Sequence, residues 1–189
     1  MNELAQTETA VEQLQIEPLP ATDPAIGRAL WQLEGARGRL KELLATLNPD
    51  WLDWEPYPGG NSIGTLLYHI ALIEIDWLFA EVLEQEYSEA AKALLPYPDR
   101  DKSGRLFGVT AVSLPDHLQR LDTARQMLLD VFTNLSLADF RRARQLPHYH
   151  VTPEWVLFHL TQHETEHRGQ IGEIISWRKQ HGREDSQSL

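Results

Sequence analysis

The chain has 189 residues, 42% of them hydrophobic and 24% charged, which suits one soluble globular domain and is too short for two typical domains. A net charge of −11 argues against a nucleic-acid partner, because phosphate binding needs clustered Lys and Arg, and the lack of cysteine excludes disulfides, thiolate ligands and a cysteine nucleophile. The acidic N-terminus has the wrong charge for a signal peptide and no apolar run approaches the roughly 20 residues of a membrane span, so we expect a cytoplasmic protein without a membrane partner.

The first predicted helix follows an acidic N-terminal segment. Residues 1–22 carry few apolar side chains, which predicts a solvated tail or a short extra helix outside the domain. Asp23 and Pro24 then form an N-cap followed by proline at the first helical position. Leucines recur at helical spacing after this cap, so the first helix is expected to reach about Leu47.

The second predicted helix is followed by a long connection. Asn61 or Ser62, at the end of a loop rich in Trp, Pro and Gly, caps a helix that is expected to reach about Glu86. Residues 87–112 have little periodicity, and long structureless segments within compact domains are often functional.

Two further helices complete the pattern. Ser113 caps the third, residues 136–140 form one short turn, and Thr152 with Pro153 starts a fourth that reaches about residue 182, before a tail at 183–189. No period-two strand pattern is present. Residues 23–182 are therefore predicted to form an all-α domain, a four-helix bundle whose long second connection lets the second and third helices run parallel.

Three histidines form a candidate metal site. His163 and His167 lie one turn apart near the centre of the apolar stripe of the last helix, and His69 lies at the inner edge of the second. Burying neutral imidazoles among apolar side chains costs free energy unless each finds a partner, and one divalent metal ion satisfies all three. The alternative is three hydrogen-bonded core histidines. Zinc or nickel is the expected metal, with iron or manganese as alternatives.

Other polar residues are candidates for chemistry around the metal. Glu164 and Glu166 flank the ligands, either as solvated surface charges or as carboxylates that hold the imidazoles or accept a proton. Trp54, Tyr97 and Arg100 lie in loops and are candidates for substrate binding, although packing is a simpler role for the aromatic residues. Three other histidines, at 117, 148 and 150, are expected at the surface.

Two segments stand out, NSIGTLLYHIALIEIDWL at 61–78 and WVLFHLTQHETEHRGQI at 155–171. Together with their separation, they resemble the DinB/YfiT-like superfamily of metal-dependent enzymes, over residues 24 to about 180. The resemblance implies a four-helix bundle and a metal bound by one histidine of the second helix and two of the last. By position these are His69, His163 and His167. It also implies a homodimer, because dimers are common among the members, and some members use metal-activated thiols such as bacillithiol or mycothiol.

We therefore expect a metal-dependent thiol S-transferase of the detoxification or stress type, with a small-molecule thiol and an electrophile as substrates. Two alternatives remain: a non-catalytic, metal-binding stress-response protein, and a hydrolase that uses a bound hydroxide with Glu164 or Glu166 as proton acceptor. Residues 163–167 also match the HExxH pattern of zinc peptidases. A peptidase is disfavoured because only His181 is available downstream as a third ligand, and the short chain has little material for a substrate cleft.

Overall fold

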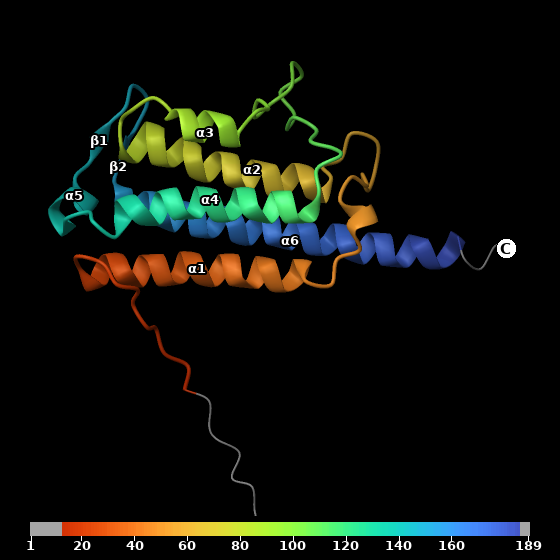
Figure 1. Cartoon of the computed structure of the whole chain (residues 1–189), viewed down its shortest axis with the longest axis horizontal. Helices are drawn as coiled ribbons and strands as arrows, with labels where there is room; N and C mark the ends of the chain where they lie inside the picture. Colours follow the sequence, from red (N-terminus) through yellow and green to blue (C-terminus); the bar gives the residue numbers. More distant parts are fainter. Residues whose placement is uncertain (1–12, 186–189) are drawn as a thin grey trace, which may run out of the picture.

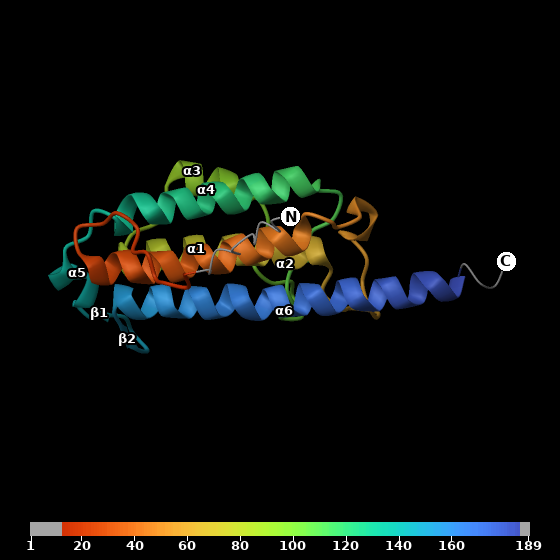
Figure 2. The ribbon, with the colours of Figure 1, turned by 90° about the horizontal axis from the view of Figure 1, so that it is seen from below.

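Four long helices run alongside one another in a bundle (Figures 1 and 2). The computed structural model describes residues 13–185. The bundle helices are α1 (Pro24–Leu44), α2 (Ile63–Asp76), α4 (Leu114–Phe132) and α6 (Pro153–Asp185). Helix α1 packs on α6, and α2 packs on both α4 and α6. The colour gradients in Figure 1 show that α2 and α4 run in the same direction, as the long connection between them predicted. The predicted all-α four-helix bundle is confirmed.

Side-chain caps fix where the bundle helices begin. The Asp23 carboxylate accepts a hydrogen bond from the Ala25 amide at 2.8 Å, and Ser62, rather than Asn61, accepts from the Thr65 amide at 3.2 Å. Ser113 accepts from the amide of Asp116 at the start of α4. Each cap satisfies an amide that has no partner within its own helix, so these predicted starts agree with the structure.

The ends of the helices differ more from the prediction. Helix α1 ends at Leu44, because the chain then turns into a short 3₁₀ helix at Pro49–Trp51. The second predicted helix is α-helical only to Asp76 and continues as a π-helical segment, Trp77–Val82, which ends near Glu84 in the left-handed region at φ 54°. The last helix passes residue 182 and reaches Asp185.

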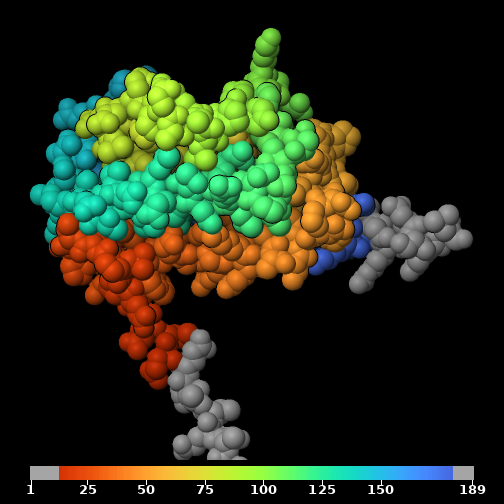
Figure 3. All heavy atoms as spheres, in the orientation of Figure 1, coloured from red at the N-terminus to blue at the C-terminus, as the bar shows by residue number. Residues whose placement is uncertain are grey.

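The long connection and the link before α6 contain short elements that the sequence did not predict. Ser88 caps a short helix, α3 (Glu89–Leu94), which packs on α4 and lies beside it at the surface (Figure 3). Strands β1 (Arg144–Gln145) and β2 (His150–Val151) form a small antiparallel hairpin. The predicted short turn is α5 (Leu137–Arg141). Elements of two to six residues are too short to produce a detectable hydrophobic period.

The N-terminal segment docks on the bundle at its end. The Leu19 amide donates to the Gly27 carbonyl and the Thr22 amide to the Thr133 carbonyl, both at 3.1 Å. A side chain at Gly27 would collide with the Leu19 carbonyl, so this contact requires glycine. Residues 1–12 of the predicted tail and 186–189 at the other end lie outside the described residues.

Contrary to the expectation from the sequence, one segment, Ile63–Val82, is apolar and long enough to cross a membrane by length and composition. In the bundle 78% of its most apolar window is buried. It also contains three acidic residues, Glu74, Asp76 and Glu81. We therefore interpret the segment as the core helix of the bundle.

His117 was expected at the surface but is only 1% exposed. Its Nδ1 lies 3.5 Å from Arg120 Nη1, and its Nε2 has no hydrogen-bond partner among the residues that the structure describes. Helix α2 passes close by, because a side chain at Gly64 would lie 3.2 Å from this Nε2. Burial, helped by the charge of Arg120, lowers the pKa of His117 to about 4, although Asp53 and Asp116 oppose the shift.

This burial predicts a pH-dependent stability. As the pH falls below about 6.5, the unfolded chain binds a proton at residue 117 that the folded protein does not bind until about pH 4. The free energy of unfolding should therefore fall by about 2 kcal/mol from this group between about pH 7 and pH 5. Urea unfolding of the wild type and His117→Gln at both pH values isolates this contribution from that of the other histidines. An identical pH dependence in both proteins would contradict it.

Candidate metal centre

The structure brings the three histidines predicted as ligands together between α2 and α6. His69 lies on α2, and His163 and His167 lie one turn apart on α6. The Nε2 atom of His163 is 3.3 Å from that of His69 and 3.0 Å from that of His167. One ligand atom from each residue lies within 4.8 Å of the other two. A metal ion bound to imidazole nitrogens at about 2.0–2.1 Å separates them by about 3.0–3.4 Å, so the spacing fits.

Outer hydrogen bonds orient two of the rings. His69 Nδ1 lies 2.9 Å from the Asp99 carboxylate, and His167 Nδ1 lies 2.9 Å from Gln170 Oε1. Both oxygens can only accept, so both Nδ1 atoms carry the proton and both Nε2 lone pairs point toward His163. A carboxylate or amide behind the imidazole is the usual support of a histidine that binds metal.

The site also keeps its histidines neutral. Burial is the main cause that lowers the pKa of all three, and for His69 the nearby His167 adds to it. Burial together with the neighbouring rings of His167, His69 and His159 lowers the pKa of His163 to about 3. Neutral imidazole is the form that binds a metal ion. A proton on His163 Nε2 can form a hydrogen bond to either of the other two Nε2 atoms, whereas one divalent cation at their centre can bind all three nitrogens at once, so the donor set fits a divalent metal.

Comparison with known proteins agrees with the fold and the site. Residues 32–171, which include all three histidines, match the DinB superfamily. The chain belongs to the DinB superfamily. A solved structure of a conserved protein from Enterococcus faecalis is similar at a TM-score of 0.63 and 15% identity, covering 79% of this chain and 94% of that chain, and it supports the fold alone. No curated protein matches the sequence.

This DinB protein therefore has a three-histidine site that can bind a metal ion, and the sequence analysis missed two residues that support it. Asp99 comes from the long connection and Gln170 from the turn of α6 after His167. The position of Gln170, three residues after a ligand, was a usable signal. Asp99 had no such signal, because its contact with His69 spans 30 residues.

Removing the carboxylate behind His69 should weaken metal binding. In Asp99→Ala the imidazole loses the acceptor that holds its orientation and its tautomer, so metal affinity is expected to fall by about 10–100-fold. Competition with a chelator of known affinity measures the change. Asp101→Ala is the matched control, because this carboxylate lies in the same loop but bonds to Ser103 and Arg105 instead. Equal affinities in the two variants would show that Asp99 does not support the site.

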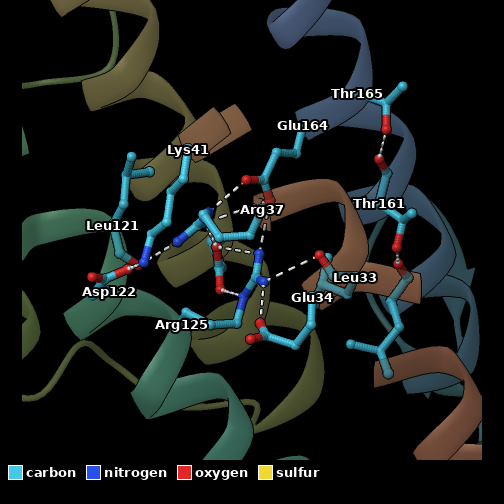
Figure 4. Close-up of polar contacts among 12 residues, drawn as sticks. Leu33, Glu34, Arg37, Lys41, Leu121, Asp122, Arg125, Thr161, Glu164 and Thr165 are labelled. Atoms are coloured by element: carbon cyan, nitrogen blue, oxygen red, sulfur yellow. Dashed lines mark hydrogen bonds and ion pairs between the residues drawn. The ribbon is translucent and has the colours of Figure 1, made fainter. Parts of the chain in front are cut away.

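The two glutamates proposed as proton acceptors lie in different surroundings. Glu164 is 2% exposed and its two oxygens bind Arg37 and Arg125 (Figure 4). Glu166 is exposed and lines a hollow between α1 and α6, beside Trp31 and Arg39. The two side chains are two residues apart in α6 and therefore point in nearly opposite directions, Glu164 into the bundle and Glu166 along the surface, where its charge raises the pKa of His167 against the effect of burial.

Glu164 belongs to a buried ion cluster that the sequence analysis did not identify. Each bundle helix contributes one of its four central members: Arg37 (α1), Glu74 (α2), Arg125 (α4) and Glu164 (α6). Four ion pairs of 2.5–2.8 Å join them, and Glu34 at the edge also binds Arg125. The two carboxylates stand on the two helices that carry the metal ligands. The cluster therefore ties α2 to α6 beside the metal centre.

The three residues expected to bind substrate occupy different places. Arg100 Nε lies 3.2 Å from Asp99 Oδ2, and the Tyr97 ring stacks on Phe107 at 5.6 Å between centroids, so both lie in the loop that supports His69. Trp54 lies instead under the guanidinium of Arg178, near the far end of α6. The structure thus places Tyr97 and Arg100 near the metal centre and Trp54 in a separate contact.

Proposed function

We propose that this DinB protein is a metal-dependent thiol S-transferase. The observation that carries the proposal is the three-nitrogen site itself, which fills only three coordination positions of a metal ion and so leaves at least one for a substrate atom. A bound divalent ion supplies Lewis acidity that lowers the pKa of a coordinated thiol. The chain has no cysteine, so the reacting thiol has to come from a second molecule.

The residues of the chain orient the imidazoles, keep them neutral and provide a surface for the substrates. Asp99 and Gln170 hold the imidazoles of His69 and His167 in the orientation and tautomer that a ligand requires. In the proposed reaction the thiol sulfur forms a bond to an electrophilic carbon, the leaving group departs with its electron pair, and the thiol proton passes to water.

Two hollows adjoin the supporting residues and provide surface for substrate binding. One, of about 310 Å³, is lined by Gln170 together with Tyr57 and Asn61 from the loop at 51–62. The other, of about 240 Å³, is lined by Asp99 and Tyr97 from the long connection. The two loops contain the residues that the sequence predicted to bind substrate, and each hollow includes one residue that supports a histidine.

Turnover tests the proposal directly. Metal-loaded protein is incubated with individual cellular thiols and a panel of electrophiles, and the thioether product is detected by mass spectrometry. We expect turnover with at least one pair and none with His163→Ala. If fully loaded protein gives no product with any thiol, the transferase is wrong and a non-catalytic metal-binding protein takes its place. For the alternative hydrolase, Glu166 is the remaining candidate for the proton acceptor, because Glu164 is held by two arginines.

We also propose a homodimer that acts in the cytoplasm in a stress response. A face between α1 and α6 suits contact between two copies, because it exposes 60% of Phe158 beside Trp31 and carries both Arg39 and Glu166. Opposite charges on one face can pair across a two-fold axis. The cytoplasm is also where small thiols are kept reduced. Sedimentation of the wild type and Phe158→Glu tests the dimer, since a monomer in both would contradict it.

A further inference from the structure

A second site lies beyond the metal centre, where α2, β2 and α6 meet. A hollow of about 430 Å³ is bounded there by three aromatic side chains and three smaller or polar ones, and we call it the aromatic hollow. Its lining residues are Trp77, Tyr149, His150, Val151, Thr152 and Trp155. The volume lies within the range of sites for small molecules. None of these six residues is Lys, Arg, Asp or Glu, so the lining suits an uncharged ligand.

The aromatic rings of the hollow are available to a ligand. Trp155 is 46% exposed and Tyr149 is 44% exposed, whereas the bundle core buries its large apolar side chains. The Trp77 centroid lies 5.4 Å from that of Trp155 and 6.3 Å from that of Tyr149, so the three rings form one surface. Exposed apolar residues gathered in one place commonly mark a binding site.

A ladder of rings connects the aromatic hollow to the metal centre. The His159 ring stacks on Trp155 at 5.1 Å with an angle of 8° between planes, and it lies 4.5 Å from Trp77. On its other side His159 lies 6.0 Å from the ring of His163, one of the metal ligands. The hollow is therefore joined to the metal site through the ring contacts of His159.

Two features next to the rings lower the stability of the fold and are typical of a binding site. Tyr149 donates a 2.7 Å hydrogen bond to Glu81, which is 6% exposed and whose second oxygen has no hydrogen-bond partner among the described residues. An unpaired buried carboxyl oxygen costs free energy, and here the other oxygen holds a partly exposed aromatic ring in place. Trp77 opens the π-helical segment, a conformation that occurs frequently at functional sites.

We infer that the aromatic hollow binds an uncharged aromatic group of the electrophilic substrate. Aromatic rings associate with Trp and Tyr in offset or edge-to-face geometry, and this hollow offers three such rings without a charged group. The ladder through His159 places the bound group on the His163 side of the metal, opposite the hollow lined by Gln170. The inference rests on the proposed transferase and assigns a substrate class to it.

Binding of a non-reacting probe tests the inference without catalysis. Nitrobenzene is titrated into ¹⁵N-labelled full-length protein, and the indole N–H resonances are followed by NMR. Nitrocyclohexane, of similar size but not aromatic, is the comparison ligand. We expect nitrobenzene to bind about tenfold more tightly than nitrocyclohexane and to shift the resonances of Trp77 and Trp155. Equal affinity for the two probes, or no binding, would overturn the inference.

Variants of the lining residues test whether the probe binds in the aromatic hollow. Trp155→Leu is expected to weaken nitrobenzene binding by about tenfold, and Phe158→Leu, an exposed aromatic on another face of the same helix, is expected to leave it unchanged. Tyr149→Leu is a second test on another element, should Trp155→Leu not fold. Unchanged binding in the folded hollow variants would overturn the proposal. If Trp155→Leu instead turns a dimer into a monomer by sedimentation, the hollow is an interface between copies and the proposal fails.

The metal centre is tested apart from the hollow. Nitrobenzene binding should persist in chelator-treated protein and in the triple variant His69→Ala/His163→Ala/His167→Ala, because none of these residues lines the hollow. Probe binding with no turnover would remove the transferase and leave the subsite. Turnover with no probe binding would remove the subsite and leave the transferase.

Discussion

Replacing Arg125 with methionine is expected to lower the free energy of unfolding by about 3–5 kcal/mol. The substitution leaves Glu74 and Glu164, 2% exposed each, without one of their two guanidinium partners. An uncompensated buried carboxylate is strongly destabilising, because water cannot replace the lost ion pair. Urea unfolding at neutral pH measures the change.

An ion pair at the surface serves as the control that shows whether burial causes this loss of stability. Lys41 and Asp122 also join α1 to α4, at 2.6 Å, but their side chains are 43% and 52% exposed. Lys41→Met is therefore expected to cost less than about 1 kcal/mol. A similarly small cost for Arg125→Met would contradict the role of the buried cluster.

Replacing the whole cluster by apolar residues should have a different effect. A variant with Arg37→Met, Glu74→Leu, Arg125→Met and Glu164→Leu is expected to be at least as stable as the wild type, because no buried charge remains. Its metal affinity should still fall, since the carboxylates of α2 and α6 no longer share the guanidiniums that tie these helices together. Stability and metal affinity would then change in opposite directions, which loss of folding alone does not produce.

Substitution of His163 by alanine is expected to remove most of the stabilisation that metal gives. His163 is the central ligand, with its Nε2 at 3.3 Å and 3.0 Å from the other two. At a free zinc concentration about a thousand times Kd, binding stabilises a protein by about 4 kcal/mol. For a chain of this length that corresponds to a rise in Tm of about 8–16 °C, which the variant should lack.

His159→Ala is the control for this experiment. His159 lies one turn away on α6 and stacks on Trp155, outside the group of three nitrogens. Its zinc-dependent rise in Tm should equal that of the wild type. A rise retained in His163→Ala, or lost equally in both variants, would contradict the assignment of His163 as a ligand.

Local signals account for what the sequence predicted correctly. Asp23, Ser62 and Ser113 are strong N-caps placed before long apolar periods, so the starts of three bundle helices could be read directly. His163 and His167 share a face because four residues make about one helical turn. His69 joined them because it lies on the inner side of α2, which packs against α6.

The features that sequence analysis missed depend on contacts between distant residues. Arg37 and Glu164 are 127 residues apart, and a charged residue in an amphipathic helix normally lies at the surface, so the ion cluster gave no signal. His117 is buried because α2 passes over it at Gly64, which the pattern of α4 alone does not reveal. The π-helical segment likewise continues the apolar period of α2 without a break in composition.

The most direct test of the metal centre is the metal content of protein purified without a His-tag, measured by elemental analysis. The triple variant His69→Ala/His163→Ala/His167→Ala is measured beside it. Three converging nitrogens predict close to one divalent metal ion per chain in the wild type and almost none in the variant. Wild-type protein that is reproducibly free of metal, and that binds no zinc, nickel, iron or manganese on titration, would show that the three histidines are core residues.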